Sequence, residues 1–91
     1  MLRRSIVTAD GVAAPASSQG EIYSILINTD GSASVVSIYD GQDGSGTLLR
    51  VVRTTTGQAE TNLFIPYYNG LYVDVDAHTT SVVIVYDGAK P

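Results

Sequence analysis

The apolar residues of this chain occur in short runs that alternate with polar residues, and nowhere do they recur with the spacing of a helix. No window places apolar side chains at i, i+3, i+4 and i+7 over several turns. β-Branched residues, which favour extended backbone, dominate the apolar set, and Gly, Pro, Asn or Asp bounds each run. The sequence therefore predicts an all-β fold.

Seven segments fit this pattern: Arg3–Thr8, Glu21–Asn28, Ala33–Asp40, Thr47–Thr55, Glu60–Pro66, Leu71–Ala77 and Ser81–Asp87. We interpret them as one small antiparallel β-sandwich, jelly-roll-like and of about seven strands, that spans residues 1–91. The small and polar residues of Asp10–Gly20 predict a flexible loop or arm after the first strand, with a short strand near Val12 as an alternative.

Two stretches of the chain are nearly the same: VVSIYDG at Val35–Gly41 and VVIVYDG at Val82–Gly88 agree at five of seven positions. Each follows an apolar strand and a short turn, which predicts that each is the second strand of a β-hairpin. We expect the tyrosine ring to cap the core with its hydroxyl in solvent. Asp-Gly should then end the strand, because Asp bonds its own backbone in turns and Gly accepts a left-handed conformation. An internal duplication and a chance likeness both explain the pattern.

The last strand carries apolar side chains on both faces, with Val82, Ile84 and Tyr86 on one side and Val83 and Val85 on the other. Glu21–Asn28 alternates in the same way, with Tyr23, Ile25 and Ile27 opposite Ile22, Ser24 and Leu26. Such strands are typical of positions covered on both sides. In a chain of 91 residues a second covered face implies another chain or a packed loop, and we expect a homo-oligomer.

The charge and the cysteine content exclude several classes of partner. The formal net charge is −4 and the pI is near 4.5, which disfavours a nucleic-acid surface because phosphate binding needs clustered Lys and Arg. The chain has no cysteine, hence neither a disulfide framework nor a thiolate metal site. No apolar run is long enough for a secretory signal or a membrane span. We expect a protein made in a cytoplasm, without nucleic-acid or membrane partners.

The candidate chemistry is weak at every position considered. His78 lies in a predicted turn, and a pairing with Ser81 lacks a third orienting group. The stretch DGQDGSG at Asp40–Gly46 lacks the alternating ligands and the final Glu of a calcium loop. Asp74 and Asp76 share a strand face at a spacing that would suit a glycosidase pair, but no aromatic cleft surrounds them. We therefore expect no catalytic, metal or cofactor site, and a non-enzymatic protein.

The tyrosines are the stronger signal. Tyr67 and Tyr68 follow Pro66 in a turn, and Tyr72 lies on the polar face of the next strand. Clustered exposed tyrosines favour an interface and could also stack on a sugar ring, whereas the alternative is that they plug the end of the sandwich. The candidate interface residues are Arg3, Arg4, Tyr67, Tyr68 and Tyr72.

The succession ILINTDGSASVVSIYDG, GSGTLL, FIPYYNGLYVDVDA and VVIVYD resembles small β-sandwich virion proteins of tailed bacteriophages. The resemblance covers Ile6–Asp87, and its motifs are structural turn signatures, so no set of functional residues is carried over. It implies a head decoration, or cement, protein that assembles on the capsid exterior, often as a trimer bound to the major capsid protein. On this hypothesis Arg3 and Arg4 contact an acidic shell surface.

Two other classes stay open on the sequence. A tail- or fibre-associated module, or a carbohydrate-binding β-sandwich, would use the tyrosines as stacking platforms. A small hydrolase is the weakest alternative, since it would need a cleft that contains a perturbed carboxylate.

Overall fold

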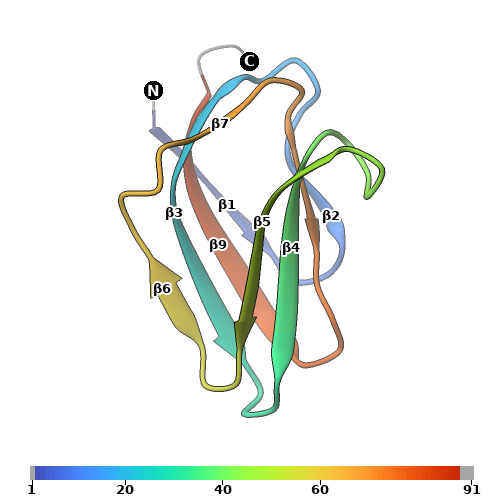
Figure 1. Cartoon of the computed structure of the whole chain (residues 1–91), viewed down its shortest axis with the longest axis vertical. Helices are drawn as coiled ribbons and strands as arrows, with labels where there is room; N and C mark the ends of the chain where they lie inside the picture. The colour runs from blue at the N-terminus through green and yellow to red at the C-terminus, as the bar shows by residue number, and fades with distance from the viewer. Residues whose placement is uncertain (1, 89–91) are drawn as a thin grey trace.

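The computed structural model describes residues 2–88, and this part of the chain forms nine β-strands and no helix. In chain order they are β1 (Leu2–Val7), β2 (Gly11–Ala14), β3 (Gly20–Thr29), β4 (Ser34–Asp40), β5 (Thr47–Thr54), β6 (Gln58–Glu60), β7 (Ile65–Tyr67), β8 (Leu71–Asp74) and β9 (Thr79–Gly88) (Figure 1). The described residues therefore contain no helix that could cross a membrane.

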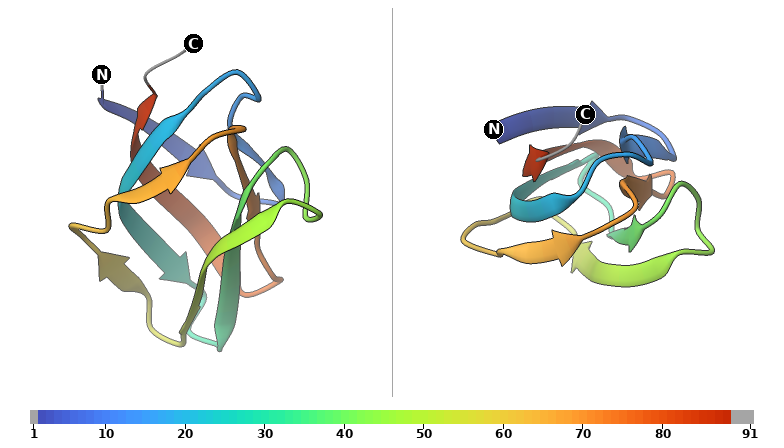
Figure 2. Two further views of the ribbon diagram at one scale, coloured as in Figure 1. Left: turned by 45° about the horizontal axis from the view of Figure 1, so that its top comes forward. Right: turned by 90° about the horizontal axis from the view of Figure 1, so that it is seen from above.

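The strands form two antiparallel sheets that pack face to face (Figure 2). The five-stranded sheet has the order β1-β9-β3-β6, with β7 also paired to β3, and the four-stranded sheet has the order β2-β8-β4-β5. The predicted all-β sandwich is confirmed, with nine strands in place of about seven. One extra strand is β2, and the other arises because the predicted strand Glu60–Pro66 is broken. Asn62 and Phe64 have positive φ there, which extended backbone does not tolerate.

Neither near-identical stretch is the second strand of a hairpin, so that prediction was wrong. β3 and β4 lie in different sheets, as do β8 and β9, and the turn before each stretch carries the chain from one sheet to the other. Gly31 has the positive φ that the Asp-Gly turn predicts. A turn signal specifies that the chain reverses but does not choose the partner strand. The long strands β3 and β9, ten residues each, pair with one another at the centre of their sheet.

The predicted arm at Asp10–Gly20 lies against the sandwich instead of projecting from it. The alternative of a short strand near Val12 is confirmed, since β2 pairs with β8, and Ala14 is buried. Ser18 is buried as well, its N–H donates to the Pro15 carbonyl at 2.9 Å, and its own carbonyl accepts from Gly70 N–H at 2.9 Å. Small residues allow this close approach, because they add little bulk between the loop and the sheets.

The core lies between the sheets and is made almost entirely of aliphatic side chains. On β9 the predicted shared face of Val82, Ile84 and Tyr86 is confirmed, and the structure shows that this face is the inner one, since all three are buried. On β3 the register shifts between Ile22 and Ser24, which leaves Tyr23 as a bulge. Strict alternation was therefore wrong for β3: Ile22 lies buried with Ile25 and Ile27.

Candidate binding surfaces

The outer face of the five-stranded sheet carries an apolar row that crosses four strands. The row consists of Ile6 on β1, Val83 on β9, Leu26 on β3 and Ala59 on β6, each directly opposite the next in the pairing register. Ile6 is 63% exposed and Leu26 43%. The sequence predicted that another chain or a packed loop covers this face, and none of the strands in residues 2–88 packs over it. The apolar row is therefore open to a partner.

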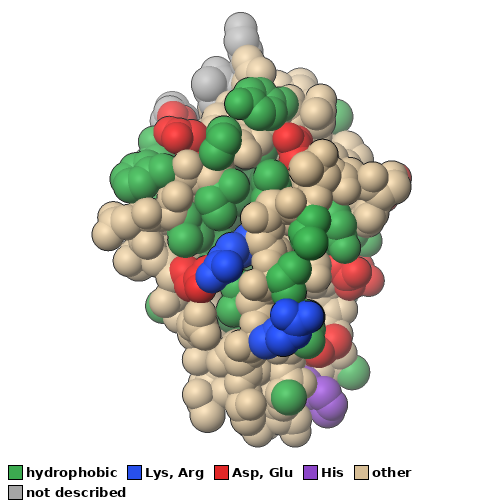
Figure 3. All heavy atoms as spheres, in the orientation of Figure 1, with side chains coloured by type: hydrophobic (Ala, Val, Ile, Leu, Met, Phe, Trp, Pro, Cys, Tyr) green, Lys and Arg blue, Asp and Glu red, His purple; other side chains and the backbone are tan. Residues whose placement is uncertain are grey.

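The outer face of the four-stranded sheet carries a second row, with two aromatic side chains between two aliphatic ones. It consists of Val12, Tyr72, Tyr39 and Leu48 on β2, β8, β4 and β5. The two tyrosine rings lie 6.4 Å apart between centroids. Burial is the largest cause that raises the pKa of Tyr72, followed by the nearby carboxylates of Asp10, Asp74 and Asp43. Figure 3 shows this side of the molecule, where hydrophobic side chains gather in the upper half and the histidine lies at the lower end.

An open cleft of about 340 Å³ lies at the upper end of the sandwich, lined by Gln19, Gly20, Glu21, Tyr67, Tyr68 and Asp87. The pairing of β3 with β7 creates it, because Gly20 lies opposite Tyr67 and brings the two segments side by side. Only glycine fits at residue 20, since a Cβ there would lie 1.6 Å from the Asp87 carbonyl oxygen. The cleft combines an exposed aromatic ring with carboxylate and amide groups.

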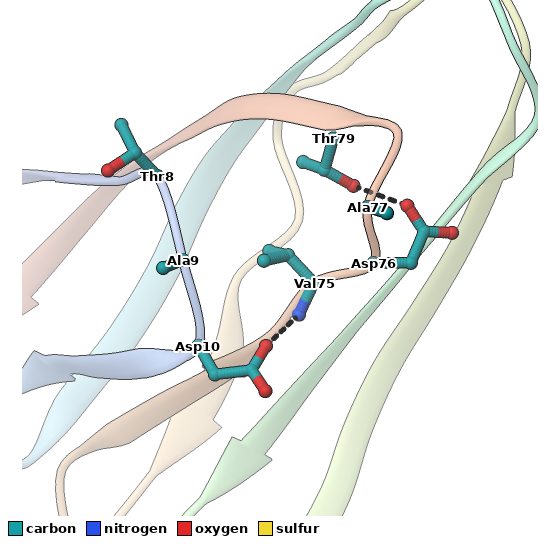
Figure 4. Close-up of a pocket in the computed structure, with 7 residues that line it drawn as sticks. All are labelled: Thr8, Ala9, Asp10, Val75, Asp76, Ala77 and Thr79. Carbon is teal, nitrogen blue, oxygen red and sulfur yellow. Dashed lines mark hydrogen bonds between the residues drawn. The ribbon is translucent and has the colours of Figure 1, made fainter.

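A pocket of about 470 Å³ lies at the opposite end, between the Thr8–Asp10 segment and the turn before β9 (Figure 4). Asp10 accepts a hydrogen bond from Val75 N–H at 2.7 Å. Asp76 accepts from Val35 N–H at 2.8 Å and from the Thr79 hydroxyl at 3.1 Å. These bonds, the Val35 N–H first, lower the pKa of Asp76. Both carboxylates thus accept hydrogen bonds that hold backbone turns in place. We therefore interpret the pocket as the space between these turns.

The possible glycosidase pair does not form. Asp74 ends β8, whereas Asp76 lies beyond the strand in the turn, so the two no longer share a strand face. Burial, then the neighbouring Asp10, raises the pKa of Asp74. The opposite pKa shifts have structural causes, and the pocket that Asp76 lines does not include Asp74.

The Asp-Gly pairs that close the two near-identical stretches lie at strand ends, but Asp40 bonds a different segment from the one we expected. Asp40 accepts hydrogen bonds from the N–H groups of Tyr68 at 3.1 Å and Asn69 at 2.8 Å, where we had expected bonds within its own turn. The strand end predicted at Asp40 is confirmed for β4, and β9 runs to Gly88, the last described residue.

The glycine-rich loop and the histidine are both held by local bonds. Asp43 accepts from Ser45 N–H at 2.9 Å, and the described residues contain no group of three or more potential metal ligands. His78 Nδ1 lies 3.0 Å from Asp30 Oδ2, which joins the two turns between the sheets. Asp30, through this hydrogen bond first and then through its charge, raises the pKa of His78.

The predicted interface residues do not form one surface. Tyr67 is 1% exposed, so its placement at a surface was wrong and the plug alternative holds for it. Tyr68 is 65% exposed at the cleft, and Tyr72 lies on the other sheet beside Tyr39. Arg3 and Arg4 are both exposed on β1 but are consecutive strand residues, which point to opposite sides.

Sequence reasoning missed the residues that only pairing brings together. No sequence pattern marks Gln19 or Glu21 as part of a site. No sequence pattern shows that Ile6 and Leu26 lie in one row on either side of Val83. The one signal that was available is the apolar pattern on both faces of Glu21–Asn28 and Ser81–Asp87, which predicted a second covered face.

The fold and these surfaces define a small antiparallel β-sandwich with an uncovered apolar face and an aromatic end cleft. Comparison of the chain with protein family models, curated proteins and solved structures found no match.

Proposed function

We propose that this protein is a non-enzymatic virion structural protein of a tailed bacteriophage, a head decoration protein that stabilises the capsid. The apolar row on the five-stranded sheet is the observation that supports a docking role. The phage assignment rests on the resemblance of Ile6–Asp87 to small virion β-sandwiches.

The apolar row suits binding to a large protein surface. Apolar patches of contiguous side chains on a small soluble domain mark interaction sites, because water contact with them is unfavourable. The four side chains lie on rigid paired strands, so little conformational entropy is lost when they are covered. On a capsid, many symmetry-related copies of a weak contact add up, which is how a small protein stabilises a shell.

Arg4 gives the docking face a charged margin. It lies on β1 two residues before Ile6 and points to the same side of the sheet. An acidic region of the major capsid protein would therefore meet Arg4 when the apolar row is covered. We propose a trimer on the capsid lattice, with each copy using this face.

The experiment is cosedimentation of the purified full chain with capsids from the encoding phage that lack it. We expect saturable binding and a higher capsid disruption temperature. The double variant Ile6→Lys/Leu26→Lys should lose binding, because both side chains are exposed in the free protein and the folded state tolerates the change. Circular dichroism melting checks that it folds.

Leu48→Lys is the matched control, since Leu48 is 51% exposed but lies on the opposite sheet. It should bind capsids like the unchanged protein. If the unchanged protein does not sediment with capsids, the decoration role is wrong. If the double variant binds equally well, the docking face is wrong.

A further inference from the structure

Tyr68 presents an aromatic ring at the end cleft from a fixed backbone. Its side chain is 65% exposed, and its hydroxyl has no hydrogen bond within residues 2–88. Its N–H donates to both carboxylate oxygens of Asp40 at 3.1 Å, and the next N–H, from Asn69, donates to the same carboxylate at 2.8 Å. The backbone that carries the ring is therefore held in place, and the ring is exposed to a ligand.

The floor of the cleft is rigid and buried. The Tyr67 hydroxyl shares a hydrogen bond with Ser18 Oγ at 2.8 Å and donates to the Asp87 carbonyl at 3.1 Å. The Tyr67 ring packs edge-on against Tyr86, with 6.1 Å between centroids. A preformed floor lowers the entropic cost of binding a small ligand.

The rim of the cleft supplies groups that bond hydroxyls. Glu21 is half-buried, and its carboxylate has no hydrogen bond or ion pair with residues 2–88. Gln19 adds an exposed amide, which both donates and accepts. A carboxylate beside an open aromatic face accepts hydrogen bonds from hydroxyl groups while the ring covers an apolar surface.

The charge of the cleft selects among ligands. Glu21 lines it and has no ion pair with residues 2–88, so a phosphate or an acidic sugar beside this carboxylate would be repelled. A pyranose ring has the matching pattern, with a face of C–H groups for the negative face of an aromatic ring and hydroxyls at its edge. We propose that this cleft binds a neutral pyranose sugar, with Tyr68 as the stacking platform and Glu21 and Gln19 as hydroxyl partners.

The test is a titration of the ¹⁵N-labelled full chain with methyl glycosides of glucose, galactose, mannose and N-acetylglucosamine, followed by amide chemical shifts. We expect at least one of them to shift amides of Gln19, Glu21, Tyr68 and Asn69 in a saturable way. Tyr68→Ala should weaken that binding about tenfold, and Glu21→Gln should weaken it as well.

Phe64→Ala is the matched control, because Phe64 is also an exposed aromatic residue, at 56%, but lies outside the cleft against Tyr23. It should leave sugar binding unchanged. The proposal is overturned if none of the four glycosides shifts the cleft amides, or if Tyr68→Ala and Phe64→Ala bind alike. Capsid docking is proposed to use the side chains of the apolar row, which does not include Tyr68, so Tyr68→Ala should not affect capsid binding. The two proposals can therefore fail separately.

Discussion

The two near-identical stretches of the chain bury opposite faces. The first lies in β4 and the second in β9, and five of their seven residues are the same. The side chains that face the core are the second and fourth of the first stretch, Val36 and Ile38, but the first, third and fifth of the second stretch, Val82, Ile84 and Tyr86. Since a strand with apolar residues on both faces fits a core either way, identical residues do not imply equivalent positions.

The two positions at which the stretches differ indicate which face of each strand is buried, whereas the identical positions do not. Ser37 points outward in the first stretch, and its counterpart Ile84 is fully buried in the second. At the next position Ile38 is buried, and its counterpart Val85 is only half-buried. In both places the larger apolar side chain faces the core, because burial of more apolar surface is more favourable.

The starts of the two stretches nevertheless lie together. Val35 N–H donates to Asp76, in the turn that precedes the second stretch. Asp30 lies in the turn that precedes the first stretch; its N–H donates to the His78 carbonyl at 3.0 Å, and its Oδ2 lies 3.0 Å from His78 Nδ1. The two turns that carry the chain between the sheets are thus joined by hydrogen bonds at one end of the molecule. The strands that follow them, β4 and β9, nevertheless bury different positions of the shared stretch.

The largest expected effect is a difference in stability loss between substitutions at the fourth position of each stretch, Ile38 and Val85. Ile38→Ala should lower the free energy of unfolding by about 2–5 kcal/mol, because it leaves a cavity among fully buried neighbours. Val85→Ala should cost about 1 kcal/mol or less, since Val85 is half-exposed on the outer face. Urea unfolding measures both. Equal losses of unfolding free energy would contradict the finding that the fourth position faces the core in β4 but not in β9.

The shared tyrosine gives a smaller contrast. Tyr86 is buried and its hydroxyl donates to the Ala13 carbonyl at 3.2 Å, whereas we had predicted that it reaches solvent. Tyr86→Phe should therefore destabilise the fold by about 1 kcal/mol, because it leaves that carbonyl without its partner. Tyr39→Phe should change stability by less than about 0.5 kcal/mol. Thermal unfolding of the two variants side by side tests this, and a larger loss for Tyr39→Phe would reverse the assignment.

The smallest effect concerns the tie between the two crossings and depends on pH. The pKa of His78 is raised above 6.5 by its bond to Asp30, and the pKa of Asp30 is lowered below 3.8, with His78 as the first cause. The raised pKa contributes stability below pH 6.5 that is lost as the pH rises through the folded-state value. The lowered pKa contributes stability above pH 3.8 that is lost on acidification.

The pair should therefore stabilise the fold most between these limits. An NMR titration of the His78 ring should give a pKa above 6.5 in the unchanged protein and one closer to 6.5 in Asp30→Asn. Identical titration curves would show that the bond is absent in solution. Both side chains are half-exposed or more, so salt should weaken the shift.

The candidate surfaces were predictable only in part. The exposure of Arg3, Arg4 and Tyr68 follows from their place in a polar edge or a turn, and the structure has them exposed. The burial of Tyr67 next to exposed Tyr68 does not follow, because it depends on Ser18 and on the end of β9 as hydrogen-bond partners.

The sequence by itself determined where the longer strands lie and which side chains are apolar. Alternation and turn residues are local properties, so β3, β4, β5 and β9 were all predicted within a few residues of their bounds. It also determined that β9 would bury Val82 and Ile84 together, since residues two apart share a face.

Only the tertiary structure decided which strands pair and which face each one buries. Hydrogen-bond partners in a sheet are distant in sequence, and an Asp-Gly turn fits a hairpin and a crossing between sheets equally well. The pairing of β3 with β9 and with β7 set both the apolar row and the cleft beside Tyr68. A strand that is apolar on both faces can pack only one face into the core. The packing of the whole core decides which face that is, and the other face stays on the surface.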